Sequence, residues 1–194
     1  MGAVLMSKKV ADGIRYNNGM WKVLAVLDSL PWYTDKVMGA FNKHGHTYQA
    51  HPVSCAAALA VQKVIRNENL LQNIRERGAQ LESLLRTKLT GPNSPSKPFI
   101  VDIRGGGGFW GIEFEPEPIK LPEIKGVRFG PYFQEVAFKN GLVVFGMSGS
   151  IDGYKGEFSL LAPALNVTSE EVDKIAYLFV KSVEEALKDA GVIS

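Results

Sequence analysis

The histidines of this chain are concentrated in one short stretch, HGHTYQAHP, over residues 44–52. His44, His46 and His51 are its three histidines, and Cys55 follows four positions after the last of them. Imidazole and thiolate are groups that zinc accepts. However, His44 and His46 lie in a glycine loop with no carboxylate nearby, and structural zinc sites normally show four ligands at recognisable spacing. We therefore predict no metal site and keep zinc as the weaker alternative.

Four consecutive glycines, Gly105 to Gly108, could approach a phosphate closely with their backbone N–H groups. A nucleotide-binding fingerprint needs a strand, glycines and then a helix, whereas a second strand follows here. The glycines therefore predict a hairpin turn. The chain has no G-x-S-x-G elbow, and Cys55 within SCAAALA indicates a small buried side chain, so covalent catalysis by serine or cysteine has no support.

A long helix is predicted directly after the histidine stretch. Pro52 suits a first helical position, where its missing N–H is not needed. Apolar residues recur at helical spacing, with a predicted bend at residues 67–69, as far as Leu89. The three prolines of residues 91–98 end this helical region.

The remainder alternates strands and helices. Strands are predicted at residues 99–104, 109–114, 142–145 and 158–161, and a helix at 127–140. The last helix begins at Thr168, which forms a T-x-x-E capping box with Glu171. This order predicts a small α/β domain with a mostly antiparallel sheet covered by helices.

The N-terminal part has a different character. Its apolar run, residues 3–6, predicts a buried strand without neighbours, and residues 15–41 fit neither adjoining segment. A lone strand and a long helix with an uncovered face should leave an apolar patch, which predicts self-association.

Composition narrows the classes of partner and compartment. The net charge of +2 is spread along the chain and forms no basic block, so we predict no nucleic-acid partner. A single cysteine fits a reducing compartment. With no secretory signal and no apolar run long enough for a membrane span, the expected location is cytoplasmic, with no membrane partner.

Several segments together carry a resemblance: HGHTYQAHPVSCAAALAVQKVI, RERGAQLESLL, DIRGGGGFWGIEF and GLVVFGMSGSIDGYKGEFSLLAPALNVTSEEVDKI. In this order they resemble the C-terminal half of class III pyridoxal-phosphate-dependent aminotransferases. GAVLMSKKVADGI is similar to the family's segment just after its cofactor lysine. Only residues 15–41 lack a recognised counterpart and are interpreted as an atypical insert.

The resemblance implies an α/β chain that forms part of the type I transferase fold. Residues 1–51 would be the end of the large cofactor-binding domain, 52–90 an interdomain helix with the helix after it, and 91–194 the small C-terminal domain.

The resemblance also assigns residue roles. Thr47 would donate to the phosphate of pyridoxal 5'-phosphate (PLP) bound in the partner subunit, so a homodimer is expected. Arg104 matches a family arginine beside the sheet turn. It would bind a substrate carboxylate, or it would form a structural salt bridge; both interpretations stay open.

Two positions depart from subgroups of the family. Phe145 stands at about the place of a switching arginine found in many amine-specific members. Lys155 stands where another subgroup has an arginine, and lysine keeps the charge but loses the bidentate fork. Lys155 is therefore a weaker candidate for substrate binding.

The family's cofactor lysine falls upstream of the residues that match Met1 to Lys9. The sequence thus predicts an aminotransferase C-terminal fragment, inactive alone, from a family that moves an amino group from an amino acid or amine to a 2-oxo acid. A non-catalytic partner or regulator of a full-length aminotransferase is the alternative. A misjudged gene model, or a decayed gene copy, would explain both the missing lysine and the insert.

Overall fold

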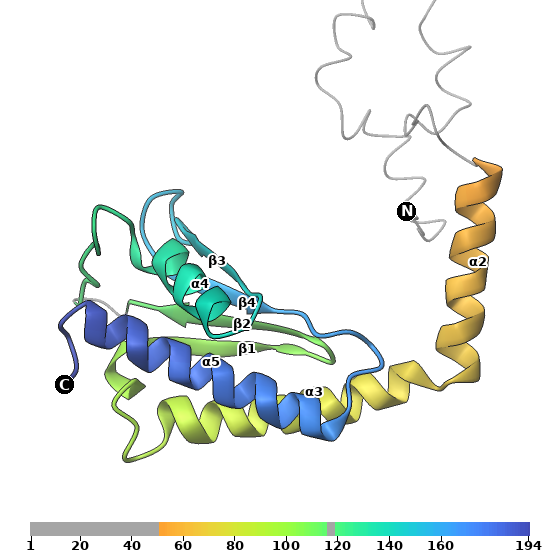
Figure 1. Cartoon of the computed structure of the whole chain (residues 1–194), viewed down its shortest axis with the longest axis horizontal. Helices are drawn as coiled ribbons and strands as arrows, with labels where there is room; N and C mark the ends of the chain where they lie inside the picture. The colour runs from red at the N-terminus through yellow and green to blue at the C-terminus, as the bar shows by residue number, and fades with distance from the viewer. Residues whose placement is uncertain (1–50, 116–118) are drawn as a thin grey trace, which may run out of the picture. The chain divides into compact units, whose positions relative to one another are not determined.

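The computed structural model describes residues 51–115 and 119–194 (Figure 1). The chain divides into two compact units, Met1–Lys63 and Val64–Ser194, and each is considered by itself. The first strand and the segment 15–41 predicted from the sequence lie outside the described residues. The predicted domain boundaries at residues 51/52 and 90/91 stay predictions.

Two helices precede the sheet, as the sequence predicts. Helix α2 spans Pro52–Asn67 and helix α3 spans Leu70–Thr90. Asn69, at the predicted bend, adopts a left-handed conformation with φ 51°. Asparagine tolerates this conformation better than most residues, which explains why the helical path is interrupted here.

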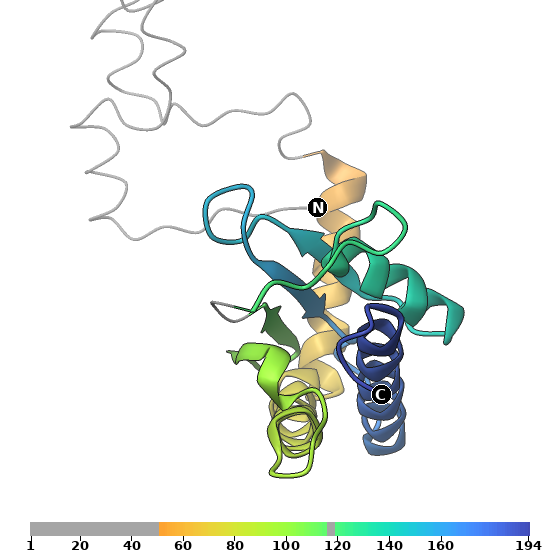
Figure 2. The ribbon, with the colours of Figure 1, turned by 90° about the vertical axis from the view of Figure 1, so that its left-hand side faces the viewer.

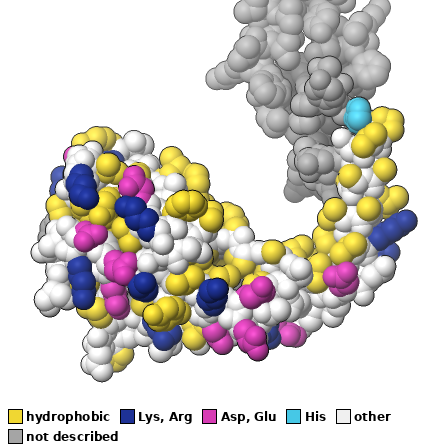
Figure 3. All heavy atoms as spheres, in the orientation of Figure 1, with side chains coloured by type: hydrophobic (Ala, Val, Ile, Leu, Met, Phe, Trp, Pro, Cys, Tyr) yellow, Lys and Arg dark blue, Asp and Glu magenta, His cyan; other side chains and the backbone are white. Residues whose placement is uncertain are grey.

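Helix α2 buries none of its side chains, although its sequence is largely apolar. Val53 and Leu59, for example, are 72% and 57% exposed, and yellow side chains are visible along α2 in Figure 3. The interpretation of Cys55 as a buried side chain is wrong, because Cys55 is exposed and, among the described residues, none packs over α2 to bury it. In contrast, α3 buries Ile74, Leu81, Leu85 and Leu89.

The sheet has four described strands: β1 (Ile100–Gly106), β2 (Phe109–Phe114), β3 (Phe145–Ser148) and β4 (Glu157–Leu161). Their order is β1-β2-β4-β3, and each neighbouring pair is antiparallel. The predicted hairpin turn at the glycines is confirmed, with Gly107 in a positive-φ conformation of +54° between β1 and β2.

The strand predicted at residues 142–145 is misplaced, because β3 begins only at Phe145. Leu142 donates its N–H to the carbonyl of Ala137, and Gly141 has φ +87°, so this segment still belongs to the turn that closes the preceding helix. Leu142 and Val144 are buried, which gives the connection the apolar character of a strand.

Helices α3, α4 (Phe129–Lys139) and α5 (Ser169–Asp189) lie along one face of the sheet (Figure 2). Alternate strand residues point into this layer: Trp110, Ile112 and Phe114 of β2 are all buried. The ring of Phe114 packs edge-on against Phe129 at 5.3 Å between centroids. The buried core therefore lies between the helices and this face of the sheet.

The capping box predicted for the last helix is confirmed. Thr168 accepts a hydrogen bond from the Glu171 N–H at 3.2 Å, and the Glu171 carboxylate accepts one from the Thr168 N–H at 2.8 Å. Within the described ranges, no helix combines the length and apolar character needed to cross a membrane.

Candidate functional site

The face of the sheet that the helices leave uncovered carries most of its exposed strand residues. Because side chains alternate along a strand, the residues between the buried ones share this second face. We call this surface the open face; its described members are Asp102, Arg104, Phe109, Gly111, Glu113, Phe145, Met147, Phe158 and Leu160.

A cavity of about 500 Å³ lies on the open face. Arg104 and Glu113 are its charged lining residues, whereas Phe109, Phe158 and Leu160 supply apolar walls. Gly111 leaves this space open, because a Cβ there would stand 3.5 Å from Leu160 Cδ2 and any longer side chain would extend into the hollow. The cavity therefore suits a small molecule with a charged end and an apolar chain.

The charged residues of the cavity belong to an ion network centred on Arg104. Arg104 Nη1 donates to Glu113 Oε2 at 2.6 Å and to Asp102 Oδ2 at 3.1 Å. Asp102 and Glu113 are direct cross-strand partners in the β1·β2 register, where like charges destabilise a sheet. Arg104 bridges the two carboxylates, and the hydrogen bond to Glu113, followed by that to Asp102, raises the pKa of Arg104 above its ordinary value.

The rest of the Arg104 guanidinium remains available. Both of its hydrogen bonds come from Nη1, and within the described residues Nε and Nη2 have no hydrogen-bond partner. These two nitrogens form the side edge of the planar fork that matches a carboxylate bidentately. Arg104 thus stabilises the sheet through one nitrogen and can accept an external carboxylate along the opposite edge.

The loop between β3 and β4 adds one polar group to the same cavity. Ser150 lines it and lies 3.5 Å from Glu113, measured from Oγ to Oε1. The loop is ordered by Asp152, whose Oδ1 accepts hydrogen bonds from the N–H groups of Tyr154 and Lys155 at 2.9 and 2.7 Å. These hydrogen bonds lower the pKa of Asp152, so its carboxylate stays charged.

The residues singled out in the sequence differ in their position relative to the cavity. Arg104 lines the cavity, whereas Lys155 is exposed and does not. Phe145 lies on the open face, with its ring 6.4 Å from that of Phe158. An apolar ring therefore occupies the place where some relatives were expected to have a switching arginine.

The residue predicted to contact the cofactor and most of the histidine stretch belong to the part of the chain outside residues 51–115 and 119–194. Thr47, His44 and His46 lie outside the described residues. His51 directly precedes α2, with its Nδ1 3.5 Å from Ser54 Oγ. Over residues 51–115 and 119–194, no three His, Cys, Asp or Glu side chains come together as a metal-binding group.

Sequence reasoning missed Glu113 and Ser150. The alternation in FWGIEF placed Glu113 on the opposite face from Trp110 and Ile112, so that pattern could have identified it. No comparable signal exists for Ser150, because the conformation of the loop brings it to the cavity.

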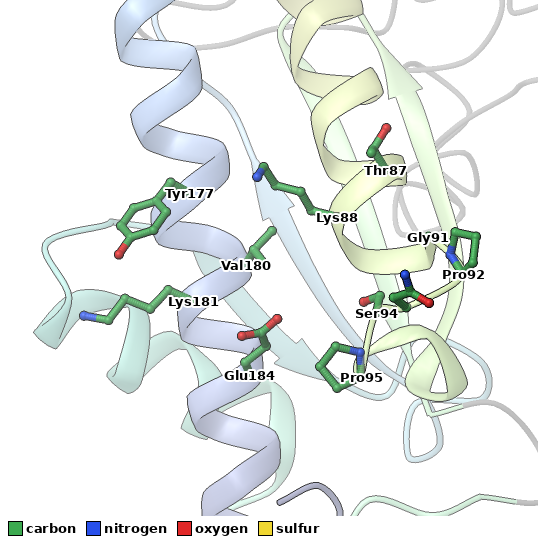
Figure 4. Close-up of a pocket in the computed structure, with 11 residues that line it drawn as sticks. Thr87, Lys88, Gly91, Pro92, Ser94, Pro95, Tyr177, Val180, Lys181 and Glu184 are labelled. Atoms are coloured by element: carbon green, nitrogen blue, oxygen red, sulfur yellow. The ribbon is translucent and has the colours of Figure 1, made fainter.

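A second cavity, of about 550 Å³, lies among α5, the end of α3 and the loop that follows (Figure 4). Lys88, Lys181 and Glu184 bring charges of both signs to it. Lys181 already donates to Asn140 at 3.0 Å and pairs with Glu185 at 3.6 Å. The charged groups do not converge on one ligand type, so the open face remains the better candidate site.

The cavity on the open face fits a substrate carboxylate better than it fits a phosphate. Arg104 and the apolar walls fit a substrate with a carboxylate, but the cavity holds no second cation or cluster of N–H donors that would fit a phosphate. The expected phosphate contact, Thr47, belongs to the undescribed part.

Comparison with known proteins identifies the family. Residues 29–183 match the aminotransferase class-III family model. An aminotransferase of Gibberella zeae is 36% identical over 151 residues, which are 77% of this chain and 28% of the relative. Gamma aminobutyrate transaminase 1, a mitochondrial protein of Solanum lycopersicum, is 28% identical over 192 residues, which are 97% of this chain and 30% of the relative.

Solved structures agree. The crystal structure of a Bacillus anthracis aminotransferase is similar with a TM-score of 0.61 at 27% identity, covering 78% of this chain and 32% of that one. The chain thus spans about three tenths of the length of the relatives it matches. The family match and the α/β fold both agree with the resemblance seen in the sequence, and the chain belongs to the class-III aminotransferase family.

Proposed function

We propose that this chain forms the C-terminal part of a PLP-dependent enzyme that transfers an amino group from an amino acid or amine to a 2-oxo acid. The observation that carries this proposal is the open edge of Arg104 in a cavity that also has apolar walls. Every 2-oxo acid has a carboxylate, and a planar guanidinium is the side chain best suited to hold one.

Each part of the cavity has a role in this proposal. Arg104 binds and orients the substrate carboxylate through Nε and Nη2, while Nη1 stays anchored on Glu113 and Asp102. The side chains of Phe109, Phe158 and Leu160 exclude water from the carbon chain of the substrate. When bound, PLP supplies the electron sink and carries the amino group between the two substrates.

The cofactor and the subunit arrangement rest on the family resemblance. We assign the phosphate contact to Thr47, acting on PLP in the partner subunit of a homodimer. A hydroxyl near the start of a helix suits this role, because the helix N-terminus favours an anion. Lys155 is retained as a weaker substrate contact, since it lies outside the cavity that Arg104 lines.

The test uses the native gene product, isolated from its source cells and supplied with PLP. A panel of amino acids and amines is offered together with 2-oxo acids, and the new amino acid is measured. Transfer that falls at least tenfold in an Arg104→Gln variant, with PLP still bound, is the expected result. A PLP-loaded product that transfers no amino group across the panel would contradict the proposal.

The 194-residue chain by itself should show no turnover. The resemblance places the cofactor lysine ahead of the residues that match Met1 to Lys9, and the family chemistry needs that lysine. The same assay on the purified chain checks this, and turnover above the background of free PLP would sink it.

A further inference from the structure

Glu113 is the most enclosed member of the charged network on the open face. Its side chain is 15% exposed, whereas those of Asp102 and Arg104 are 46% and 61% exposed. Glu113 also makes the shorter contact, at 2.6 Å against 3.1 Å for Asp102. The attraction between Arg104 and Glu113 is therefore less screened by water than that between Arg104 and Asp102.

The network carries one more negative charge than positive. Two carboxylates share a single guanidinium, and they bind it at the same nitrogen. A carboxylate that binds to the other edge of Arg104 meets a cation that is already neutralised, with Glu113 lining the same cavity. Specificity often depends on such a repulsive element as well as on an attractive one.

We propose that Glu113 determines the specificity of the cavity by lowering its affinity for carboxylates relative to uncharged ligands of the same shape. This inference rests on the proposed role of Arg104. Glu113 neutralises Arg104 and repels an incoming anion, so the cavity accepts both a carboxylate and an uncharged apolar group. Without Glu113, Arg104 would keep only the more exposed Asp102 as its counter-ion, and the cavity would favour carboxylates more.

The experiment compares butyrate with butyramide, which share an apolar tail and differ in charge. Ligand-observed NMR titrations of the 194-residue chain give the Kd of each, and the readout is their ratio. Damage to the cavity would change both Kd values together, whereas a change in charge preference changes the ratio.

Glu113→Gln keeps the shape of the side chain and removes its charge. We expect it to shift the ratio towards butyrate by about fivefold or more, because a unit charge a few ångströms from the ligand is removed from a partly enclosed site. Asp102→Asn removes the same charge from a more exposed position and should shift the ratio by about twofold. An unchanged ratio in Glu113→Gln, or a shift towards butyramide, would overturn the inference.

Arg104→Gln separates this inference from the proposed function. It should abolish the preference for butyrate in the Glu113→Gln background, which leaves the two ligands nearly equal. If the preference survived without Arg104, the proposed carboxylate role of Arg104 would itself be wrong. If only Glu113→Gln left the ratio of Kd values unchanged, the role of Glu113 in specificity would be wrong, while the carboxylate role of Arg104 would stand.

Discussion

Glu157 is a buried carboxylate with a complete set of partners. It is 2% exposed, pairs with Arg128, and accepts hydrogen bonds at 2.7 Å from the Gly130 N–H and the Ser148 hydroxyl. The contact with Gly130 places a negative charge at the start of α4, where the helix dipole is favourable. This single side chain joins β4 to β3 and to α4.

Removing Glu157 should therefore destabilise the C-terminal unit. Glu157→Ala removes the ion-pair partner of Arg128 and leaves the Gly130 N–H without its acceptor, so it is expected to cost about 3–5 kcal/mol in the free energy of unfolding. Glu157→Gln keeps the shape and should cost about 1–3 kcal/mol. Urea denaturation measures both changes, with Glu135→Gln on the exposed side of α4 as the matched control. Equal stability of Glu157→Ala and the control would contradict this account.

A second residue-scale prediction concerns the turn at Lys125 and Gly126. Both have positive φ, 55° and 78°, and the flanking Ile124 and Val127 form a small antiparallel bridge. Asparagine followed by glycine suits such a turn better than lysine does. Lys125→Asn should stabilise the protein by about 0.5 kcal/mol, whereas Gly126→Ala should destabilise it by about 1 kcal/mol or more. Thermal unfolding should show a higher Tm for Lys125→Asn and a lower Tm for Gly126→Ala. A lower Tm for Lys125→Asn would disprove the assignment of this turn.

At the scale of the element, the capping box of α5 has a pH dependence of known sign. The hydrogen bond from the Thr168 N–H lowers the pKa of the Glu171 carboxylate below its ordinary value of 4.5. A group with a lowered folded pKa contributes stability above its unfolded pKa and loses it as the pH falls through the folded value.

Glu171→Gln should therefore lower Tm at neutral pH, and the difference from the unsubstituted chain should shrink as the pH falls below 4.5. Thr168→Ala, which removes the hydroxyl cap, should cost about 1 kcal/mol. Thermal unfolding followed by circular dichroism across this pH range is the measurement. A Tm difference that stays constant with pH would show that the carboxylate does not act through the cap.

The elements with strong local signals could be predicted from the sequence. The glycine hairpin and the Thr168 cap depend on nearby residues only, so their patterns suffice. The start of β3 could not be predicted, because buried Leu142 and Val144 resemble a strand while they serve the end of α4.

Only part of the candidate site could be predicted from the sequence, because the rest depends on how the strands pair. Arg104 was identified through the family resemblance, and alternation could have assigned Glu113 to one face of its strand, but the contact of Glu113 with Arg104 and Asp102 depends on the register between β1 and β2. That register shifts between Ile100 and Asp102, which brings Asp102 opposite Glu113. A single sequence does not reveal such an irregularity, because it arises from strand pairing and not from local preference.

At the scale of the whole molecule, the two parts should behave differently in solution. The unit Val64–Ser194 has its own core, which includes the aromatic cluster of Phe114, Phe129, Phe133 and Phe179. Helix α2 instead presents apolar side chains to solvent. The chain of residues 64–194 is expected to unfold cooperatively as a monomer, and the 194-residue chain to self-associate.

Analytical ultracentrifugation and thermal unfolding of both chains measure this contrast. In the 194-residue chain, replacing Leu59 and Val61 with Gln should reduce self-association, since both are more than half exposed. The double substitution Lys63→Gln with Arg66→Gln on the same helix serves as the control. Association that persists unchanged without the apolar side chains of α2 would place its cause elsewhere.

The order of the strands also sets a sequence of events in folding. β1 with β2, and β3 with β4, are pairs of strands that follow one another in the chain, whereas β2 with β4 joins residues far apart in it. Pairing β2 with β4 closes a longer loop of chain than either hairpin does, and closing a longer loop has the larger entropic cost. The β2·β4 pairing is therefore expected to come last.

That late step also assembles the cavity. Arg104 and Glu113 belong to the first hairpin, while Ser150, Phe158 and Leu160 belong to the second. A ligand held in the cavity therefore binds only after the two halves have joined. Its binding should slow their separation, so that occupancy of the cavity appears as kinetic protection against unfolding.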